Sequence, residues 1–315
     1  MSTKPRLGIQ IQIAVVVLMV SLLFFVFAVY AQGKDRLEQV EIVRDSWGVA
    51  HVYAETNAGV FFGAGFATAQ DRMLQMELFR RAVQGRLAEI LGPDWLEHDI
   101  CTRTLGLYRH AQLIVEHLAP DTREALEAYA AGVNHCLQND NENMAAVFAK
   151  RGWVPEPWTA ADSIAVWMRL SEFFDRSWQY EVHALRTYQA GTQRGESKVP
   201  VIDNEAAVVE EEDFARTNPA VYRRLKAKAK ETVTYVPGFE GIKASHAWAV
   251  DGSRTTTGKP LLESDPQIAV TLPSLWYEIH LHGGDYNTRG IGVAGAPGFL
   301  IGWNEHLAWG ATALG

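Results

Sequence analysis

Residues 243–250 read KASHAWAV, and the character of the chain changes at this stretch. From Ser245 onward, short apolar or alternating runs are separated by Gly, Pro and Asp, which is typical of strands joined by turns. These runs are SHAWAVDG (245–252), KPLLESD (259–265), SLWYEIHLHGG (274–284) and GFLIGWN (298–304). The sequence therefore predicts a β-rich region that begins at Ser245.

The chain before this region favours helices. Two short strands are predicted at 40–54, and Thr159 is a candidate N-cap for the last helix. Between the strands and Gly92-Pro93, apolar residues recur at helical spacing, and Gly92-Pro93 ends this first long run. Helices are expected at 58–91, 103–118, 121–138 and 159–190.

A charged linker is expected between the helices and the later strands. It includes the acidic run 210–213 and ends in YVPGFEG at 235–241. The order of helices, linker and strands indicates an α+β protein with a candidate processing site at the boundary. The predicted regions are 1–35, 36–190, 191–244 and 245–315.

Bulk composition excludes some classes of function. The chain has 315 residues and a net charge of −8, and it shows no basic stripe of the kind that binds nucleic acid. The Lys/Arg cluster at 223–230 is interpreted as a solvated helix face. Cys101 and Cys136 are too few for a disulfide framework, although they could pair in an oxidising compartment.

The N-terminus carries an export signal. Lys4 and Arg6 precede an uncharged, mostly apolar run at 7–31, and charges return at 34–36. A run of about 20 apolar residues spans a bilayer, and the preceding positive charges keep its start inside. We expect an uncleaved anchor, with a removed signal peptide as the alternative. Both place the rest of the chain on the periplasmic side of the cytoplasmic membrane.

Two sequence patterns favour structural interpretations. Residues 290–295 match GxGxxG, but Pro297 and Gly298 follow where a dinucleotide site needs a helix. A glycine-rich turn between strands is therefore predicted, and a nicotinamide-dependent enzyme is given little weight. His280 and His282 would share one strand face, and without a third ligand they are interpreted as structural.

Several blocks resemble the penicillin acylase family. EIVRDSWGVAHVYAE (41–55), GAGFATAQDRMLQMELFRRAVQGRLAEILG (63–92) and EPWTAADSIAV (156–166) look like its α-chain. SHAWAVDGSRTTTGKPLLESDPQ (245–267), SLWYEIHLHGG and GAPGFLIGWNEHLAWGAT (295–312) look like the start of its β-chain. The blocks follow the family order from about residue 40 to the end. The resemblance implies an N-terminal nucleophile hydrolase with an αββα fold, incomplete in this chain, and an α/β heterodimer after self-cleavage.

The resemblance also implies the catalytic residues. Cleavage would fall between Ala244 and Ser245, and the freed α-amine of Ser245 would act as base for its own hydroxyl. An α-amine with a pKa of about 7.7–8.0 suits this task near neutral pH. The backbone N–H of Ala313, or of Leu314 one residue on, would bind the oxyanion. Gln267 would support the amine and the oxyanion.

Metal and substrate sites follow from the same resemblance. Glu181 aligns with a carboxylate that binds structural calcium. Phe173 or Phe174, with Ile268 and Leu300, would line an acyl pocket. The substrate is an N-acyl amide, with either an aromatic acyl group, as in penicillin G, or a fatty acyl chain, as in acyl-homoserine lactones.

Two departures from the family leave an alternative open. His246 stands where the family usually has Asn after the nucleophile. The chain stops at Gly315, whereas the family's β-chain continues and supplies the second oxyanion donor and most calcium ligands. We therefore expect a fragment of a longer product. The alternative is an inactive, truncated or membrane-tethered family member with a non-catalytic role.

Overall fold

The computed structural model describes residues 39–139, 148, 152–174, 244–268 and 270–312. The described residues from Val40 onward fall in one compact unit. Among the described residues, none of the helices has both the length and the apolar character that crossing a bilayer requires. The membrane span expected at 7–31 lies outside the described residues, as does most of the expected linker.

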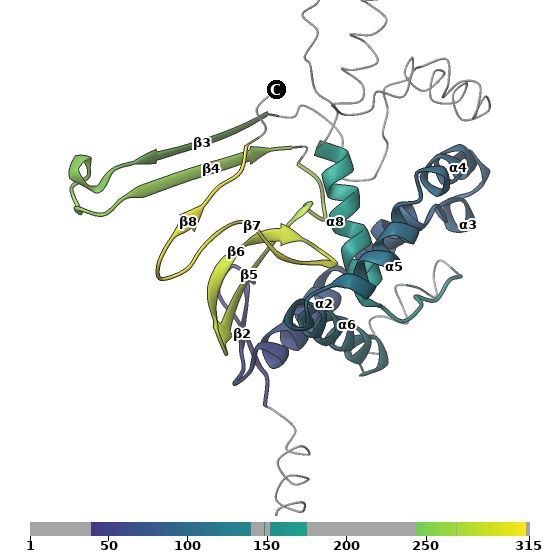
Figure 1. The fold of residues 1–315 in the computed structure, drawn as a ribbon, viewed down its shortest axis with the longest axis horizontal. Coiled ribbons are helices and arrows are strands. Elements are labelled where there is room, and N and C mark those ends of the chain that lie inside the picture. Colours follow the sequence, from purple (N-terminus) through teal and green to yellow (C-terminus); the bar gives the residue numbers. More distant parts are fainter. Residues whose placement is uncertain (1–38, 140–147, 149–151, 175–243, 269, 313–315) are drawn as a thin grey trace, which may run out of the picture. The chain divides into compact units, whose positions relative to one another are not determined.

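Six strands form one sheet with contributions from both sides of the linker (Figure 1). All neighbouring strands are antiparallel except β2 and β5, which are parallel. The two strands predicted at 40–54 are confirmed, with the turn closed at Gly48 (φ +80°). In order across the sheet, the strands are β1 Glu41–Arg44, β2 Ala50–Tyr53, β5 Trp276–Gly283, β6 Tyr286–Val293, β7 Ala296–Trp303 and β8 Ala308–Trp309.

The helical prediction is confirmed in type and corrected in its breaks. The run predicted at 58–91 splits because Gly85 takes a left-handed conformation (φ +66°) and ends the first helix. Gly106 (φ +72°) separates two helices in the same way, so the helix predicted at 103–118 is wrong in its bounds. The helical elements are α2 Asn57–Gln84, α3 Ala88–Leu91, η1 Pro93–Trp95, α4 Leu96–Leu105, α5 Leu107–His117, α6 Pro120–Asn139 and α8 Ala160–Phe174.

The core lies where α2 packs between the sheet and α6. Val52 from β2, Met73 and Met76 from α2, and Ile279 from β5 belong to one buried cluster. The two helices cross at glycines, because a Cβ on Gly132 would lie 1.9 Å from the carbonyl oxygen of Phe62. The close crossing therefore depends on the absence of a side chain.

The glycine run at 290–295 lies in β6 and in the turn that follows. Gly290 and Gly292 are strand residues, so the prediction of a turn is right only for the end of the run. A Cβ on Gly292 would lie 2.4 Å from the carbonyl oxygen of Gly298, so these glycines allow β7 to approach closely. A strand follows instead of a helix, which agrees with the rejection of a dinucleotide site. No disulfide joins Cys101 and Cys136, which lie on α4 and α6.

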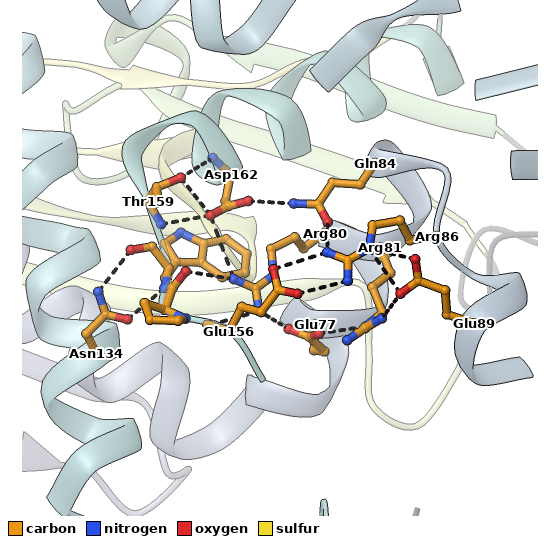
Figure 2. A network of polar contacts seen from close by, with 12 residues as sticks. Glu77, Arg80, Arg81, Gln84, Arg86, Glu89, Asn134, Glu156, Thr159 and Asp162 are labelled. Carbon is orange, nitrogen blue, oxygen red and sulfur yellow. Dashed lines mark hydrogen bonds and ion pairs between the residues drawn. The ribbon is translucent and has the colours of Figure 1, made fainter. Parts of the chain in front are cut away.

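A buried ionic network joins the end of α2 to the chain before α8 (Figure 2). Arg80 forms an ion pair with Glu77 and donates to the carbonyl oxygens of Glu156 and Pro157 at 2.9 and 3.0 Å. The side chains of Arg80 and Glu77 are only 2% and 1% exposed. Removing one member of such a pair leaves a buried charge uncompensated, which costs about 3–5 kcal/mol. The network therefore fixes the start of α8.

The first turn of α8 has reciprocal capping bonds. The Thr159 backbone N–H donates to the Asp162 carboxylate at 2.8 Å, and the Asp162 N–H donates to the Thr159 hydroxyl at 3.3 Å. Thr159 is thereby confirmed as the N-cap. Burial raises the pKa of Asp162 above its ordinary value, although Arg80 at 3.7 Å and Thr159 act in the opposite direction. Residues 175–190 of the expected helix lie outside the described residues.

Candidate active site

Ser245 lies near the start of a two-stranded antiparallel sheet. Its strand, β3 Ala244–Val250, pairs with β4 Leu261–Gln267. A short 3-10 turn, η2 Gly252–Arg254, follows β3. The register sets Ser245 opposite Pro266 and Ala244 opposite Gln267. The strand predicted from residue 245 is confirmed, and the expected scissile bond lies within it.

Gln267 lies beside the residue that follows the candidate nucleophile. Its side-chain nitrogen is 3.1 Å from His246 Nδ1 and donates to the Asp265 carboxylate. Successive side chains on a strand point to opposite faces. The register therefore places the side chains of Gln267 and His246 on the face opposite the Ser245 hydroxyl. In this uncut chain, the backbone of Gln267 is the part that lies next to the expected cleavage point.

The chain after β8 crosses this hairpin at two points. The Thr312 hydroxyl donates to the carbonyl oxygen of Ser245 at 3.1 Å. A Cβ on Gly310 would lie 2.6 Å from both Cβ and Oγ of Ser264, so only glycine permits this approach. Ser264 Oγ is buried and has no hydrogen-bond partner among the described residues. The predicted oxyanion donor, Ala313, and its alternative Leu314 follow directly but lie outside the described residues.

The four residues expected to line an acyl pocket are only partly brought together. Phe173 is buried in the main core, and Ile268 packs against the same core. Phe174 is 39% exposed, and its ring centroid is 5.1 Å from that of Phe173. Leu300 is half-buried on β7. The α8 helix contacts β7 through Trp167, whose indole N–H donates to the Pro297 carbonyl at 3.1 Å.

A small cavity lies between α2, α6 and the sheet, at a different place. Its volume is about 20 Å³, and Tyr129, Tyr277 and Phe299 are among its lining residues. A cavity of this size holds about one water molecule. None of the four expected pocket residues lines it, and it is too small for an acyl group. It is therefore a packing gap rather than the expected acyl pocket.

The described residues do not supply a calcium site. No group of three or more His, Cys, Asp or Glu side chains in this part of the chain could hold a metal ion. Glu181, which was expected to bind calcium, lies outside the described residues. The described residues therefore do not fit a bound calcium ion by themselves.

Sequence reasoning missed two sets of interacting side chains. The ionic network around Arg80 carried a weak signal, because charged residues recur at helical spacing within the otherwise apolar run of α2. The contact of His51 with His280 carried none, because 229 positions separate the two residues. His280 was expected to share a strand face with His282, and both lie on β5.

Comparison with known proteins identifies relatives along most of the chain. The penicillin amidase family matches residues 39–315. Penicillin acylase 2 proenzyme from Pseudomonas sp. (strain SE83) is 34% identical over an alignment of 269 residues that covers 82% of this chain and 34% of the relative. Acyl-homoserine lactone acylase QuiP from Pseudomonas aeruginosa is 29% identical over 297 residues, covering 89% of this chain and 34% of the relative.

A solved structure is also similar. Thermostable penicillin G acylase from Alcaligenes faecalis aligns with 66% of this chain and 97% of its own, at 23% identity and a TM-score of 0.39. The chain spans about a third of the length of the two curated relatives. The fold and the site define a mixed α/β protein with a serine near the head of a strand. The chain belongs to the penicillin amidase family, as its resemblance predicts.

Proposed function

We propose that this chain belongs to the precursor of an amidohydrolase, in which Ser245 becomes an N-terminal nucleophile. One observation carries the proposal: the family match runs through both sides of the linker and includes Ser245 near the head of β3. The relatives named above are a penicillin acylase and an acyl-homoserine lactone acylase. Both names describe cleavage of an acyl group from nitrogen.

The precursor first breaks its own Ala244–Ser245 peptide bond. Hydrolysis of this bond consumes one water molecule and leaves a carboxylate on Ala244 and a free α-amine on Ser245. A serine hydroxyl is a weak nucleophile unless a neighbouring base accepts its proton. The new amine is such a base, because an α-amine has an ordinary pKa of about 7.7–8.0.

The same serine then cleaves the substrate amide. The hydroxyl oxygen of Ser245 attacks the acyl carbon, and its proton passes through the α-amine to the departing nitrogen. The acyl group is now an ester of Ser245. Water attacks this ester with the α-amine again as base, which releases the acid and restores the hydroxyl. All protons balance without a histidine base.

The chain after β8 supplies the oxyanion donor in this proposal. Backbone N–H groups aimed at the oxyanion are worth about 2.7–4 kcal/mol each. Ala313, or Leu314, follows Thr312, whose hydroxyl donates to the Ser245 carbonyl. Thr312 is therefore proposed as the residue that positions this segment against the nucleophile. A second donor is proposed to come from residues that follow those of this chain in its relatives.

The substrate is proposed to be an N-acyl amide with an apolar acyl group. Phe173 and Ile268, which share one core, would form the base of the pocket, with Phe174 and Leu300 at its edge. An aromatic acyl group and a fatty acyl chain differ in shape, and among chains of different length each methylene is worth about 1–3 kcal/mol. Rates on a panel of acyl amides with graded tails would assign the chain to one class.

The remaining features of the proposal come from sequence and family. They are an αββα fold in the whole protein, an α/β heterodimer after the cut, and export through residues 7–31 to the periplasmic side of the membrane. Lys4 and Arg6 before the apolar run support this export. A structural calcium ion is proposed with Glu181 as one ligand, and no step of the reaction uses it.

Cleavage is the direct test. In the full-length protein, we expect a smaller chain whose N-terminal sequencing begins with Ser245-His246-Ala247. Ser245→Ala removes the hydroxyl and should leave the chain uncut and inactive toward acyl amides. Ser253→Ala, at an exposed serine in the following turn, is the matched control and should be cut normally.

Each outcome has a clear meaning. A cut at another bond, or an intact Ser245 chain that still hydrolyses amides, would contradict the proposal. A chain that stays uncut and inactive would favour the non-catalytic alternative. Intact-mass measurement identifies where the chain is cut, and an amide-hydrolysis assay separates active from inactive uncut chains.

A further inference from the structure

The outer face of the six-stranded sheet carries a row of polar side chains. On β2 and β5, Ala50, Val52, Ile279 and Leu281 are buried toward α2. Side chains alternate between faces on a strand, so His51 and its neighbours on β5 lie on the other face. His51 is directly opposite His280 in the parallel register. This contact joins a strand from before the linker to one from after it.

Three hydrogen bonds run through this pair of histidines. His51 Nδ1 is 3.0 Å from His280 Nδ1. His51 Nε2 is 3.3 Å from the Asp45 carboxylate, and His280 Nε2 is 3.0 Å from the side-chain oxygen of Asn287. The orientation of the Asn287 amide is fixed independently, because its nitrogen donates to Glu305 at 2.9 Å. Its oxygen must therefore face His280 and accept a hydrogen bond.

Counting protons gives the charge of the pair. The carboxylate of Asp45 and the oxygen of Asn287 accept, so both Nε2 atoms must carry a hydrogen. The two Nδ1 atoms need one hydrogen between them. Two rings therefore hold three protons, which is one more than two neutral imidazoles hold. All three bonds exist together only when one ring is an imidazolium and the other is neutral.

The surroundings make His280 the neutral ring. Burial lowers the pKa of His280 below its ordinary value, and the neighbouring His51, His282 and Arg289 lower it further, while the bond to Asn287 acts in the opposite direction. His51 instead faces the Asp45 carboxylate. The other titratable or charged groups around the pair are Tyr53 on β2, Glu278 on β5 and Glu305 after β7.

We infer that His51 and His280 form a pH-sensitive contact that holds the strand before the linker to the strand after it. The contact is complete when the pair holds three protons. A fourth proton at acid pH makes both Nδ1 atoms donors, which breaks the bond between the rings and places two cations side by side. Loss of the third proton at alkaline pH leaves one of the three bonds without a hydrogen.

The sign on the acid side follows from linkage. His280 has a lowered pKa in the folded chain, so the unfolded chain binds more protons below about pH 6.5. The contribution of His280 to stability is therefore present above that pH and is lost as the pH falls toward the folded pKa. If the chain is cleaved, as the proposed function requires, the same contact would join two separate chains.

The test uses the Ser245→Ala full-length protein, so that cleavage has no bearing on it. Urea unfolding is measured from about pH 5 to about pH 8, the range in which histidine changes charge. Between about pH 7 and about pH 5, we expect the folding equilibrium constant of the parent to fall about two- to tenfold more than that of the His280→Gln variant. His282→Gln is the matched control on the same strand face, outside the three bonds. Because His282 is only one of several groups that lower the pKa of His280, this profile should lie closer to that of the parent than to that of His280→Gln.

Two results would overturn the inference: parallel pH profiles for the parent and His280→Gln, or a His282→Gln profile that departs as much as that of His280→Gln. If His280→Gln does not fold, ¹⁵N spectra of the histidine rings in the parent provide the second measurement. They should show one ring with two protons and one with a single proton at some pH within the range from about 5 to about 8. Two singly protonated rings that titrate independently would also reject the inference.

Discussion

At the scale of single residues, Thr312 contacts the backbone of Ser245 from the chain that follows β8. Its hydroxyl donates to the Ser245 carbonyl at 3.1 Å, and the next residue is the predicted oxyanion donor. A shift of this segment would move the donor away from the reacting carbonyl. Small displacements of catalytic groups lower rates strongly, by about 10²-fold for 1 Å. The hydroxyl of Thr312 is therefore expected to affect kcat.

Thr312→Val removes that hydroxyl and keeps the shape of the side chain. We expect kcat toward an acyl amide to fall about tenfold with little change in KM, since one neutral hydrogen bond is worth about 0.5–1.5 kcal/mol. Thr312→Ser keeps the hydroxyl and should restore most of kcat. Steady-state kinetics on the processed full-length protein measure both. An unchanged kcat in the Val variant would show that this hydrogen bond does not position the segment.

The sequence predicts the roles and contacts of some single residues but not of others. Ser245 can be predicted as the nucleophile because KASHAWAV and the blocks around it resemble the penicillin acylase family, and this role stays a prediction. The contacts of Thr312 and Gly310 cannot be predicted, because they depend on where the chain after β8 crosses the β3–β4 hairpin. The side chain of Gln267 can be assigned to a strand, but only the register shows that it faces away from the Ser245 hydroxyl.

At the scale of elements, the crossing of α2 and α6 depends on glycine. A Cβ on Gly132 would lie 1.9 Å from the Phe62 carbonyl oxygen, and a Cβ on Gly65 would lie 2.0 Å from that of Tyr129. Both obstacles are backbone atoms, which cannot rotate away as a side chain can. The two helices would therefore have to move apart to accept any side chain here.

Gly132→Ala should lower the free energy of unfolding at the upper end of the usual range for overpacking, about 3 kcal/mol. The gain in helix propensity, about 1 kcal/mol, does not offset this clash. Ala131→Ser, at the adjacent exposed position, is the control and should change stability by less than about 0.5 kcal/mol. Urea denaturation followed by circular dichroism measures both, and a Gly132→Ala protein as stable as the parent would rule out the close crossing.

Helix types are predictable here, whereas two of the breaks are not. The spacing of apolar residues in α2 and α6 predicts helices because each buries one side against a neighbour. Gly85 and Gly106 end helices by adopting left-handed conformations, but glycine also occurs inside α2, as at Gly63. Whether a glycine ends a helix or lies inside one is set by tertiary contacts, such as the hydrogen bond that Arg103 donates to the Gly85 carbonyl at 2.8 Å.

At the scale of the whole molecule, the core is shared between residues on either side of the linker. Leu275, Ile279 and Leu281 from after the linker are buried in the same cluster as Val52 and Met73 from before it. Full burial of each such side chain contributes about 1.5–3 kcal/mol. The loss of translational and rotational freedom on association costs about 4–15 kcal/mol, so several shared side chains are needed to offset it.

We therefore expect the two pieces to remain together after cleavage at Ala244–Ser245. They should elute as one species in size-exclusion chromatography under native conditions and separate in concentrated urea. Uncut Ser245→Ala protein gives the reference elution volume. Separate elution of the two pieces without denaturant would show that the shared core does not hold them.

The parallel pairing of β2 with β5 has a consequence during synthesis on the ribosome. His51 and His280 are 229 positions apart, so at about 5–20 residues per second β2 emerges roughly 11–46 seconds before its partner strand. Helices α2 and α6 are complete much earlier and can pack while the chain is still growing. During that interval the β1–β2 hairpin presents an unpaired edge, and a nascent chain is then most exposed to aggregation and to capture by chaperones.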